Sequence, residues 1–490
     1  MKPGKKPGST SRRESGAKTG AKRKTGRKTG RKIKRKTGAT TRTRAGTAPA
    51  RVEQPIVYMV SLGCAKNQVD SERLAGCLLG EGFLLTTHPG DADLALVNTC
   101  AFIEAARSET EEVLAELQDI KKAGRLKAIV AAGCYPARTT SVPGADAVVA
   151  FEDYPHLAAR CRQALELPRR RRQAPTPGVL SCAPRLRFGL KTSAYLKISE
   201  GCDNRCAYCT IPSIRGSMRS RPMDEIVAEA EELIEDGARE LVLVGQDTAA
   251  YGMDSGDGSP QLAALMQRLL HLPGFKWLRV MYAHPANLTE EVVELFGEER
   301  VAQYLDMPIQ HADDDVLSLM GRGYTCDDLR RIIGRLRAGT PQLALRTTCM
   351  VGFPGENSTA FQRMRSFLVE ARFDHAGVFV YSPEPGTRAA RRKRQVSGRT
   401  RLKRYEELMG VQKLVASGRC MERTGDVMEV LIEQAGEGPA LGRSQFHAPD
   451  VDGKVIITRP HAGLSALRPG EFHRVVVTGA YDYDLVARLI

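Results

Sequence analysis

The sequence has no long apolar run and no sign of a secretory leader. No stretch of its 490 residues approaches the roughly 18 consecutive apolar residues that span a bilayer, so no membrane segment is predicted. The N-terminus has no apolar h-region of the kind that secretory signals carry. Without such a signal, 12 cysteines in a chain of this length indicate metal or redox chemistry in the cytoplasm rather than disulfides.

Acidic residues are nearly absent from residues 1–50, which hold 18 Lys and Arg and one acid, Glu14. The other 440 residues carry 55 basic and 56 acidic side chains, so the net charge of +16 comes from this segment alone. With repeated Lys-Thr-Gly units and few large apolar residues, residues 1–54 are predicted to form a disordered basic tail. Such a tail binds RNA non-specifically, or it is a solvated segment without a required role.

Residues 55–165 alternate short apolar runs, which are predicted strands, with helical segments. This alternation predicts an α/β domain with a doubly wound parallel sheet. A cysteine follows each of three predicted strands (56–60, 94–97 and 126–130) within a few residues: Cys64, Cys100 and Cys134. Because ligands bind at the carboxyl ends of parallel strands, these cysteines are predicted to converge in space. Two others, Cys77 and Cys161, fall in predicted helices and are expected to be core residues.

Residues 166–187 contain four consecutive arginines and several prolines, and they are predicted to be a linker. Residues 188–418 then repeat a strand and helix about six times, which predicts a partial (β/α)6 barrel. The predicted strands are 194–198, 241–244, 278–282, 304–307, 345–350 and 377–381. Polar residues that follow these strands are expected to surround one cavity: Gln246, Asp247, Thr248, His284, Gln310, His311, Ser382 and Glu384.

Cys202, Cys206 and Cys209 follow the first barrel strand, on the face where barrel active sites are built. Three thiolates in a tight loop can hold three irons of a cubane cluster. Such clusters usually take four cysteines, so one iron would keep an exchangeable position. A structural zinc site is the alternative. Closed zinc sites usually pair two CxxC-like knuckles, however, and no second knuckle follows.

Residues 421–490 are predicted to form a small antiparallel β-barrel, because alternating runs are separated by Gly, Pro and Asp turns. This segment has seven basic and ten acidic residues. A module that grips RNA is expected to carry a basic patch, so the acidic balance speaks against RNA as its main ligand.

The spacing Cys202-x3-Cys206-x2-Cys209, with Tyr208 before the last cysteine, resembles the motif of radical S-adenosylmethionine enzymes. With a three-cysteine N-terminal domain and a terminal barrel similar to a TRAM domain, residues 55–490 resemble the methylthiotransferase family. The run Ser61-Leu62-Gly63-Cys64-Ala65-Lys66-Asn67 resembles the ribosomal-protein branch of that family, RimO, although Ala65 replaces a common proline. The tRNA branch, of the MiaB type, typically reads Thr-Tyr-Gly-Cys-Gln-Met-Asn there.

The resemblance implies methylthiolation of the β-carbon of an aspartate in the twelfth protein of the small ribosomal subunit. The reaction would proceed by radical C–H activation, sulfur insertion and methyl transfer from S-adenosylmethionine. It implies one [4Fe-4S] cluster on Cys202, Cys206 and Cys209 and an auxiliary [4Fe-4S] cluster on Cys64, Cys100 and Cys134. Tyr208, Gly352 and Glu356 are candidates for contacts with S-adenosylmethionine, and no catalytic residue is expected beyond the cluster ligands.

The expected partners are this ribosomal protein or the whole small subunit, RNA through the basic tail, and an electron donor such as flavodoxin or ferredoxin. No membrane partner is expected. Two other functions stay open: a tRNA adenosine methylthiotransferase of the MiaB type, and a non-catalytic iron–sulfur or zinc protein that binds RNA or ribosomes. The motif around Cys64 and the acidic terminal barrel speak against the tRNA enzyme.

Overall fold

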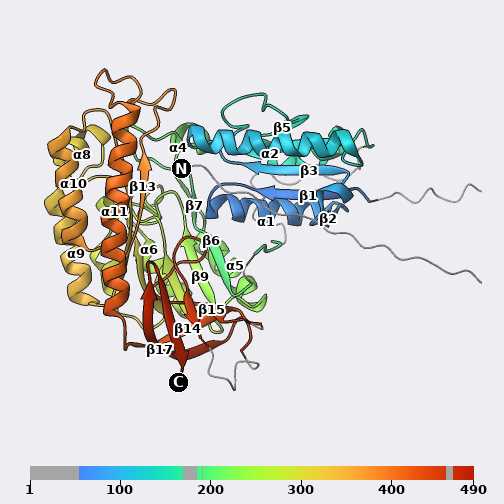
Figure 1. Cartoon of the computed structure of the whole chain (residues 1–490). Coiled ribbons are helices and arrows are strands. Elements are labelled where there is room, and N and C mark those ends of the chain that lie inside the picture. Colours follow the sequence, from blue (N-terminus) through green and yellow to red (C-terminus); the bar gives the residue numbers. More distant parts are fainter. Residues whose placement is uncertain (1–53, 169–184, 190, 437, 459–466) are drawn as a thin grey trace, which may run out of the picture. The chain divides into compact units, whose positions relative to one another are not determined.

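The structure is a computed structural model that describes residues 54–168, 185–189, 191–436, 438–458 and 467–490. The strands of these residues form two parallel sheets, one closed barrel and a two-stranded antiparallel sheet (Figure 1). The expected basic tail, apart from Gln54, and most of the expected linker lie outside the described residues. In the described parts of the chain, no helix is both long and apolar enough to cross a membrane.

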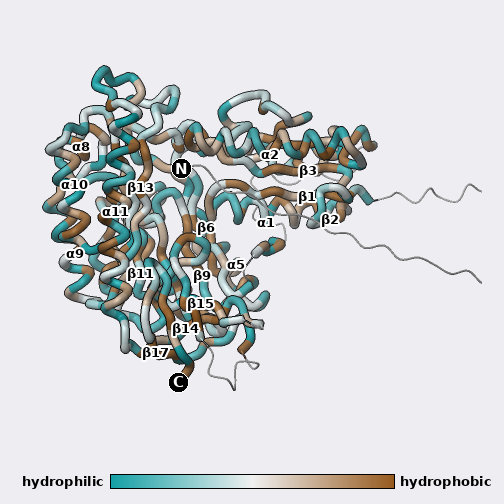
Figure 2. Tube along the Cα trace, viewed as in Figure 1, coloured by the Kyte–Doolittle hydropathy of each residue, from teal (hydrophilic) through white to brown (hydrophobic). Residues whose placement is uncertain are grey.

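The N-terminal sheet has five parallel strands in the order β2-β1-β3-β4-β5, the strand order of flavodoxin-like folds. Helices α1 and α3 pack on one face and α2 packs on the other, which confirms the expected doubly wound sheet. Strands β1 and β3 are mainly apolar, whereas α2 alternates apolar and polar residues (Figure 2). The elements are β1 (Ile56–Ser61), α1 (Ala65–Gly80), β2 (Leu84–Thr86), η1 (Pro89–Asp91), β3 (Leu94–Thr99), α2 (Glu104–Ala123), β4 (Ala128–Gly133), β5 (Ala147–Val149), η2 (Phe151–His156) and α3 (Leu157–Ala164).

The central sheet has six parallel strands with β6 and β13 at its edges, which confirms the expected partial (β/α)6 barrel. Alternate strand side chains, such as Leu196 and Leu243, pack against the surrounding helices, so the residues between them face the inside of the sheet. The strands are β6 (Ser193–Lys197), β9 (Glu240–Val244), β10 (Trp277–Val280), β11 (Val301–Asp306), β12 (Ala344–Val351) and β13 (His375–Val380). The helices are α4 (Ile211–Arg215), α5 (Met223–Glu235), α6 (Leu262–Leu270), η3 (Pro285–Asn287), α7 (Glu290–Leu295), α8 (Asp314–Met320), α9 (Cys326–Gly339), α10 (Ser358–Ala371) and α11 (Gly398–Glu422), and β7 (Ser199–Glu200) pairs with β8 (Arg219–Ser220).

The C-terminal strands close into a barrel in the order β14-β15-β16-β18-β17. They are β14 (Val427–Gln434), β15 (Ala440–Ser444), β16 (Val455–Ile457), β17 (Phe472–Tyr481) and β18 (Asp484–Leu489). Four pairings are antiparallel, as expected, but β16 and β18 pair parallel. The parallel pairing arises because β18, the second arm of a hairpin with β17, runs beside β16 in the same direction and so closes the barrel.

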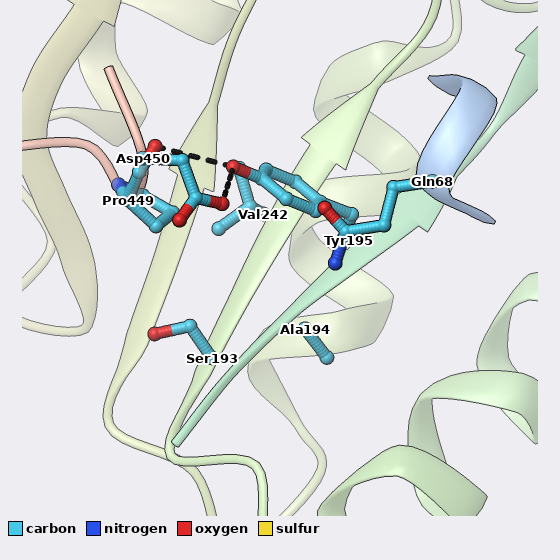
Figure 3. Close-up of a pocket in the computed structure, with 7 residues that line it drawn as sticks. All are labelled: Gln68, Ser193, Ala194, Tyr195, Val242, Pro449 and Asp450. Atoms are coloured by element: carbon cyan, nitrogen blue, oxygen red, sulfur yellow. Dashed lines mark hydrogen bonds between the residues drawn. The ribbon is translucent and has the colours of Figure 1, made fainter. Parts of the chain in front are cut away.

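The segment between β15 and β16, residues 444–452, packs against the inside of the central sheet and is called here the inner loop. The Tyr195 hydroxyl of β6 donates to Asp450 Oδ2 at 2.9 Å and lies 3.1 Å from the carbonyl oxygen of Pro449 (Figure 3). Gln68 of α1 lines the same small cavity. The N-terminal sheet, the central sheet and the C-terminal barrel therefore meet around Tyr195.

A buried ionic cluster joins the C-terminal barrel to the first residues of the central strands. Glu240 binds Arg279 and Arg443, each at 2.6 Å, and accepts a hydrogen bond from Ser193 at 2.7 Å. Burial raises the pKa of the Glu240 carboxyl, but the two guanidinium groups outweigh that effect and hold it at about 2. The amino ends of the strands are thus occupied by structural contacts, and their carboxyl ends are left for the site.

Candidate active site

Three cysteines of the N-terminal sheet stand at the carboxyl ends of adjacent parallel strands. Cys64 lies three residues after β1, while Cys100 and Cys134 directly follow β3 and β4. Burial, together with the neighbouring thiols of Cys134 and Cys64, raises the pKa of Cys100 to about 11. Cys64 is exposed although protein atoms surround it on most sides. The structure therefore brings together the three cysteines that the strand pattern predicted, and Cys64 is the most exposed residue of the three.

Glycine at position 63 permits this close approach. Its φ of +94° is in the left-handed region, and an added Cβ would lie 2.9 Å from Cys100 Cβ and 3.1 Å from Cys100 Sγ. The Asn67 side chain then joins the loops that follow the strands. Its amide donates to the carbonyl oxygens of Leu62 at 2.8 Å and Thr99 at 2.9 Å, and its Oδ1 lies 3.8 Å from Cys134 Sγ.

The second cysteine set lies in the loop after β6 and β7, which is fixed by contacts on both sides. Asn204 donates to Asp247 Oδ2 at 2.7 Å, and the amide of Ala207 donates to the carbonyl of Met320 at 2.8 Å. Burial is the main cause that raises the pKa of Cys202 to about 11 and that of Cys209 to about 12. The thiols of Cys202, Cys206 and Cys209 lie in one loop after the first central strand, as the sequence predicted.

Two donors point at sulfur atoms of this loop. The backbone amide of Ile211 donates to Cys209 Sγ at 3.4 Å, and Arg322 Nη1 donates to Cys206 Sγ at 3.4 Å. Arg322 also lies 3.4 Å from the Tyr208 hydroxyl and donates to Tyr324 at 2.7 Å. Sequence reasoning missed Arg322, because it stands more than 100 residues after the cysteines and no local pattern marks it.

The three residues expected to contact S-adenosylmethionine lie near one another. The Tyr208 ring packs edge-on against Phe353, with 6.4 Å between the ring centroids. Glu356 accepts hydrogen bonds from the amides of Gly352 and Phe353, and Arg404 Nη1 lies 3.4 Å from its Oε1. Burial raises the pKa of Glu356 to about 7. The structure thus gives Gly352 and Glu356 a role in forming a turn, and any contact with a cofactor stays a prediction.

Of the polar residues expected around one cavity, Asp247, Thr248, His284 and His311 are buried at the carboxyl ends of the central strands, and that they share a cavity stays a prediction. His284 and His311 have pKa values lowered to about 2 and about 4, with burial as the main cause, so both imidazoles are neutral. Among the described residues, the buried polar atoms at this end that have no hydrogen-bond partner include Ser199 Oγ, Gln246 Oε1 and His311 Nε2. Buried polar atoms without partners are uncommon, and these three lie at the end of the barrel where active sites are built.

Arg215 connects the two cysteine sets. It ends α4, six residues after Cys209, and its Nη2 donates to Asn67 Oδ1 at 2.5 Å and to Cys134 Sγ at 3.4 Å. Its Nη1 lies 2.9 Å from both Asp70 and Glu200. Sequence reasoning missed Arg215, although its position shortly after the cysteine loop was a usable signal.

Two further contacts hold the sets together. Thr210, next to Cys209, donates to the carbonyl of Phe102 at 3.1 Å, and Phe102 is two residues from Cys100. Glu384, which was expected to line the cavity, instead binds Arg107 at 2.6 Å and accepts a hydrogen bond from the amide of Glu104 at 2.7 Å. The two cysteine sets are therefore parts of one site.

Within the described residues, no three His, Cys, Asp or Glu side chains are gathered closely enough to hold a single metal ion. A closed zinc site needs four ligands around one ion. No preformed site of that kind is present among the described residues.

Comparison with family models divides the chain into three parts. Residues 56–148 match the uncharacterized protein family UPF0004, residues 196–368 match the radical SAM superfamily, and residues 424–490 match the TRAM domain. These matches fall on the N-terminal sheet, the central sheet and the C-terminal barrel.

Curated relatives match nearly the whole chain. A protein of Pelotomaculum thermopropionicum named ribosomal protein uS12 methylthiotransferase RimO is 42% identical, over 89% of this chain and 99% of its own length. A protein of Syntrophus aciditrophicus with the same name is 41% identical, over 89% of this chain and 98% of its own length. Among solved structures, the radical S-adenosylmethionine methyltransferase TsrM of Kitasatospora setae is 15% identical with a TM-score of 0.48, covering 67% of this chain and 77% of that one.

Proposed function

The chain belongs to the family of ribosomal protein uS12 methylthiotransferases named RimO, and we propose that it methylthiolates the β-carbon of an aspartate in uS12. The reaction joins C–H activation, sulfur insertion and methyl transfer from S-adenosylmethionine. The observation that carries the proposal is the pair of three-cysteine sets in one site, linked by Arg215. An unactivated C–H bond cannot be attacked by acid–base chemistry, and the radical SAM match supplies the required class of reaction.

The donor atoms fit two [4Fe-4S] clusters. Cys202, Cys206 and Cys209 would hold one, and the three N-terminal cysteines would hold the auxiliary one. Hydrogen bonds to ligand sulfurs are typical of such clusters, and Arg322, Arg215 and the amide of Ile211 aim such donors at three of the six thiols. When bound, the clusters and S-adenosylmethionine supply the one-electron chemistry, the sulfur and the methyl group, which no side chain of the chain can supply.

The chain's own residues would bind the cofactors, orient them and shield them from water. Three thiols per cluster leave one iron of each without a protein ligand, which is the open position that a reactant needs. The unpartnered atoms Ser199 Oγ, Gln246 Oε1 and His311 Nε2 are donors or acceptors available to a polar cofactor at the strand ends. His311 and His284 are neutral, so they add no charge at the carboxyl ends of the central strands. Tyr208, Gly352 and Glu356 stay candidates for cofactor contacts.

For partners, we infer that the substrate is uS12, free or within the small ribosomal subunit, and that the reaction takes place in the cytoplasm. The electron donor is proposed to be a flavodoxin or ferredoxin. The TRAM match favours an RNA contact near the substrate. Residues 421–490 hold more acidic than basic residues, so we expect their contact with RNA to be limited. Residues 1–50 are the more strongly cationic segment.

The test is mass spectrometry of ribosomal proteins and tRNA from a strain that lacks the gene. We expect the methylthio mass increment to disappear from uS12 and to return with the wild-type gene. A strain that carries alanine at the three cysteines of the Cys202–Cys209 loop is the matched control and is not expected to restore it. If uS12 is unchanged while a methylthioadenosine disappears from tRNA, the enzyme is instead a tRNA methylthiotransferase.

A further inference from the structure

Lys66 is a cation inside the active site that has no carboxylate partner among the described residues. It lies two residues after Cys64, near the start of α1, and its Nζ is 3.3 Å from the centroid of the Tyr282 ring. The ring face attracts a cation, so it holds the ammonium in place without neutralising it. The side chain is half-buried, and an incoming group can reach it.

The conformation of Tyr282 places its ring at this point. Tyr282 follows β10 with a φ of +64°, in the left-handed region that a tyrosine seldom adopts. Its amide lies 3.2 Å from Asp306 Oδ2, and its carbonyl oxygen accepts a hydrogen bond from Thr248 at 3.1 Å. These two contacts hold the unusual backbone at the carboxyl end of the central sheet. Such strain recurs at functional sites.

Most other cations around the site have acidic partners, although Arg322, beside Cys206, instead donates to the Tyr324 hydroxyl and to the carbonyl of Pro308. Arg215 and Lys197 share Asp70 and Glu200. Arg346 lies 3.4 Å from the carboxylate of Asp306, the acid beneath Tyr282. Lys66 differs from Arg215, Lys197 and Arg346 because its ammonium forms no ion pair with a carboxylate of the described residues; it packs on the Tyr282 ring beside Cys64, and Asp306 acts on it only from beyond ion-pair distance. This is the arrangement of a receptor for an anion that comes from outside the chain.

The proposed substrate supplies such an anion. In an aspartate side chain, the carboxylate is bonded directly to the β-carbon that is modified. A carboxylate brought into this enclosed place is unfavourable unless a cation meets it. Lys66 stands between Cys64, of the auxiliary set, and the central strand ends, where the β-carbon must lie to be reached from both cysteine sets.

We propose that the Lys66 ammonium binds the side-chain carboxylate of the target aspartate and thereby selects aspartate over the neutral asparagine. This inference rests on the proposed function. It makes Lys66 a specificity residue that contacts the substrate. Tyr282 is then a positioning residue that presents the ammonium.

The test compares two forms of purified uS12, one with the target aspartate and one with asparagine in its place. The full-length enzyme with reconstituted clusters is used as wild type, Lys66→Met and Lys66→Arg. Lys122→Met, at a well-exposed lysine in the last turn of α2, is the matched control. Binding is measured by fluorescence anisotropy with S-adenosylmethionine but without reductant, so that no turnover occurs. Iron content and the electron paramagnetic resonance spectra of both clusters are recorded for each variant.

We expect Lys66→Met to weaken binding of the aspartate form by about tenfold to a hundredfold, the usual effect of losing a charged hydrogen bond. Binding of the asparagine form is expected to change by less than about twofold, so the preference collapses, and Lys66→Arg is expected to retain most of it. Lys122→Met is expected to behave as wild type.

An unchanged preference in Lys66→Met, or an equal loss for both forms of uS12, contradicts the role of Lys66. Altered cluster spectra with an unchanged preference also contradict it, because Lys66 then supports the cluster instead. Failure of the wild-type enzyme to modify uS12 under turnover conditions contradicts the proposed function itself, which separates the two results.

Discussion

Arg215 donates a hydrogen bond to the sulfur of Cys134, with 3.4 Å between Nη2 and Sγ, although the two residues lie 81 positions apart. Arg215 belongs to the segment that follows the cysteine loop of the central sheet, and Cys134 ends a strand of the N-terminal sheet. Asp70 and Glu200 bind the same guanidinium group. One buried side chain therefore links the auxiliary cysteine set to the segment that follows the Cys202–Cys209 loop.

Replacing Arg215 by methionine is expected to lower the reduction potential of the auxiliary cluster. A reduced cluster carries more negative charge than an oxidised one. Removing a nearby cation and a hydrogen bond to sulfur therefore destabilises the reduced form more than the oxidised form, which lowers the reduction potential. The variant is also expected to lose about 3–5 kcal/mol of unfolding free energy, because Lys197 is then the one cation that still pairs with Asp70 and Glu200 among the described residues. Redox titration and chemical denaturation measure the two effects. Arg215→Lys retains the charge and should shift the potential less, whereas equal potentials in all three proteins would refute the expectation.

Removing one cysteine set at a time is expected to remove one cluster at a time. Reconstituted wild-type protein should bind about eight irons, and the triple alanine variant of either set about four. Cys161→Ala is the matched control, because Cys161 is buried in the core between the N-terminal sheet and α3. Iron analysis and the visible spectrum measure the outcome. Stoichiometric zinc without a brown chromophore would instead indicate structural zinc.

Glu240 is expected to make the fold sensitive to acid. Its pKa is depressed from about 4.5 to about 2, so its contribution is complete above about pH 4.5 and is lost as the pH falls toward 2. The shift corresponds to about 3 kcal/mol of unfolding free energy. Glu240→Gln should lose about 3–5 kcal/mol at pH 7, because Arg279 and Arg443 are left without that carboxylate, and its stability should vary less between pH 4.5 and pH 3.

Thermal and chemical unfolding across this pH range measure the effect. Glu429→Gln is the matched control, because Glu429 is 42% exposed and pairs with Lys276 near the surface. Its loss is expected to stay below about 1 kcal/mol. Parallel stability curves for the wild type and Glu240→Gln would show that the carboxyl of Glu240 does not titrate in this way.

Glu356 is expected to have the opposite pH dependence. Its pKa is raised from about 4.5 to about 7, so the folded protein holds a proton that the unfolded chain releases. Its contribution is therefore complete below about pH 4.5 and is lost as the pH rises through 7, by up to about 3 kcal/mol. Glu356→Gln mimics the neutral form and should lack this dependence, and at pH 8 it should unfold at a higher denaturant concentration than wild type. A variant that is less stable at every pH would show that Arg404 requires the charged form.

Both cysteine sets could be predicted from the sequence. The apolar pattern of a strand and the spacing of cysteines in a loop each involve residues that are close together in the chain. Cys64, Cys100 and Cys134 each follow an apolar run, and parallel strands must end at the same edge of their sheet. Two strands of that sheet, β2 and β5, were not predicted, because a three-residue strand is too short to show a period.

The residues that serve the cysteines could not be predicted in the same way. Arg215, Arg322 and Asn67 act through contacts between segments far apart in the sequence. Arg215 and Asn67 stand a few residues after a cysteine, but their partners cannot be read from the sequence, and nothing near Arg322 in the chain marks it. Glu384 was expected at the cavity because it follows a strand. The structure shows that a strand end also faces the neighbouring sheet, where Arg107 binds this carboxylate.

The inner loop constrains how this chain can evolve and be engineered. Its Asp450 binds Tyr195 inside the central sheet, so the C-terminal barrel contributes part of the interior of the catalytic barrel. Exchanging residues 421–490 for the terminal barrel of another protein would change the partners of Tyr195, Arg279 and Glu240 together with any RNA-binding surface. A working chimera must therefore keep residues 444–452 matched to the central strands, and this part of the barrel is not free to vary with whatever the outer face binds.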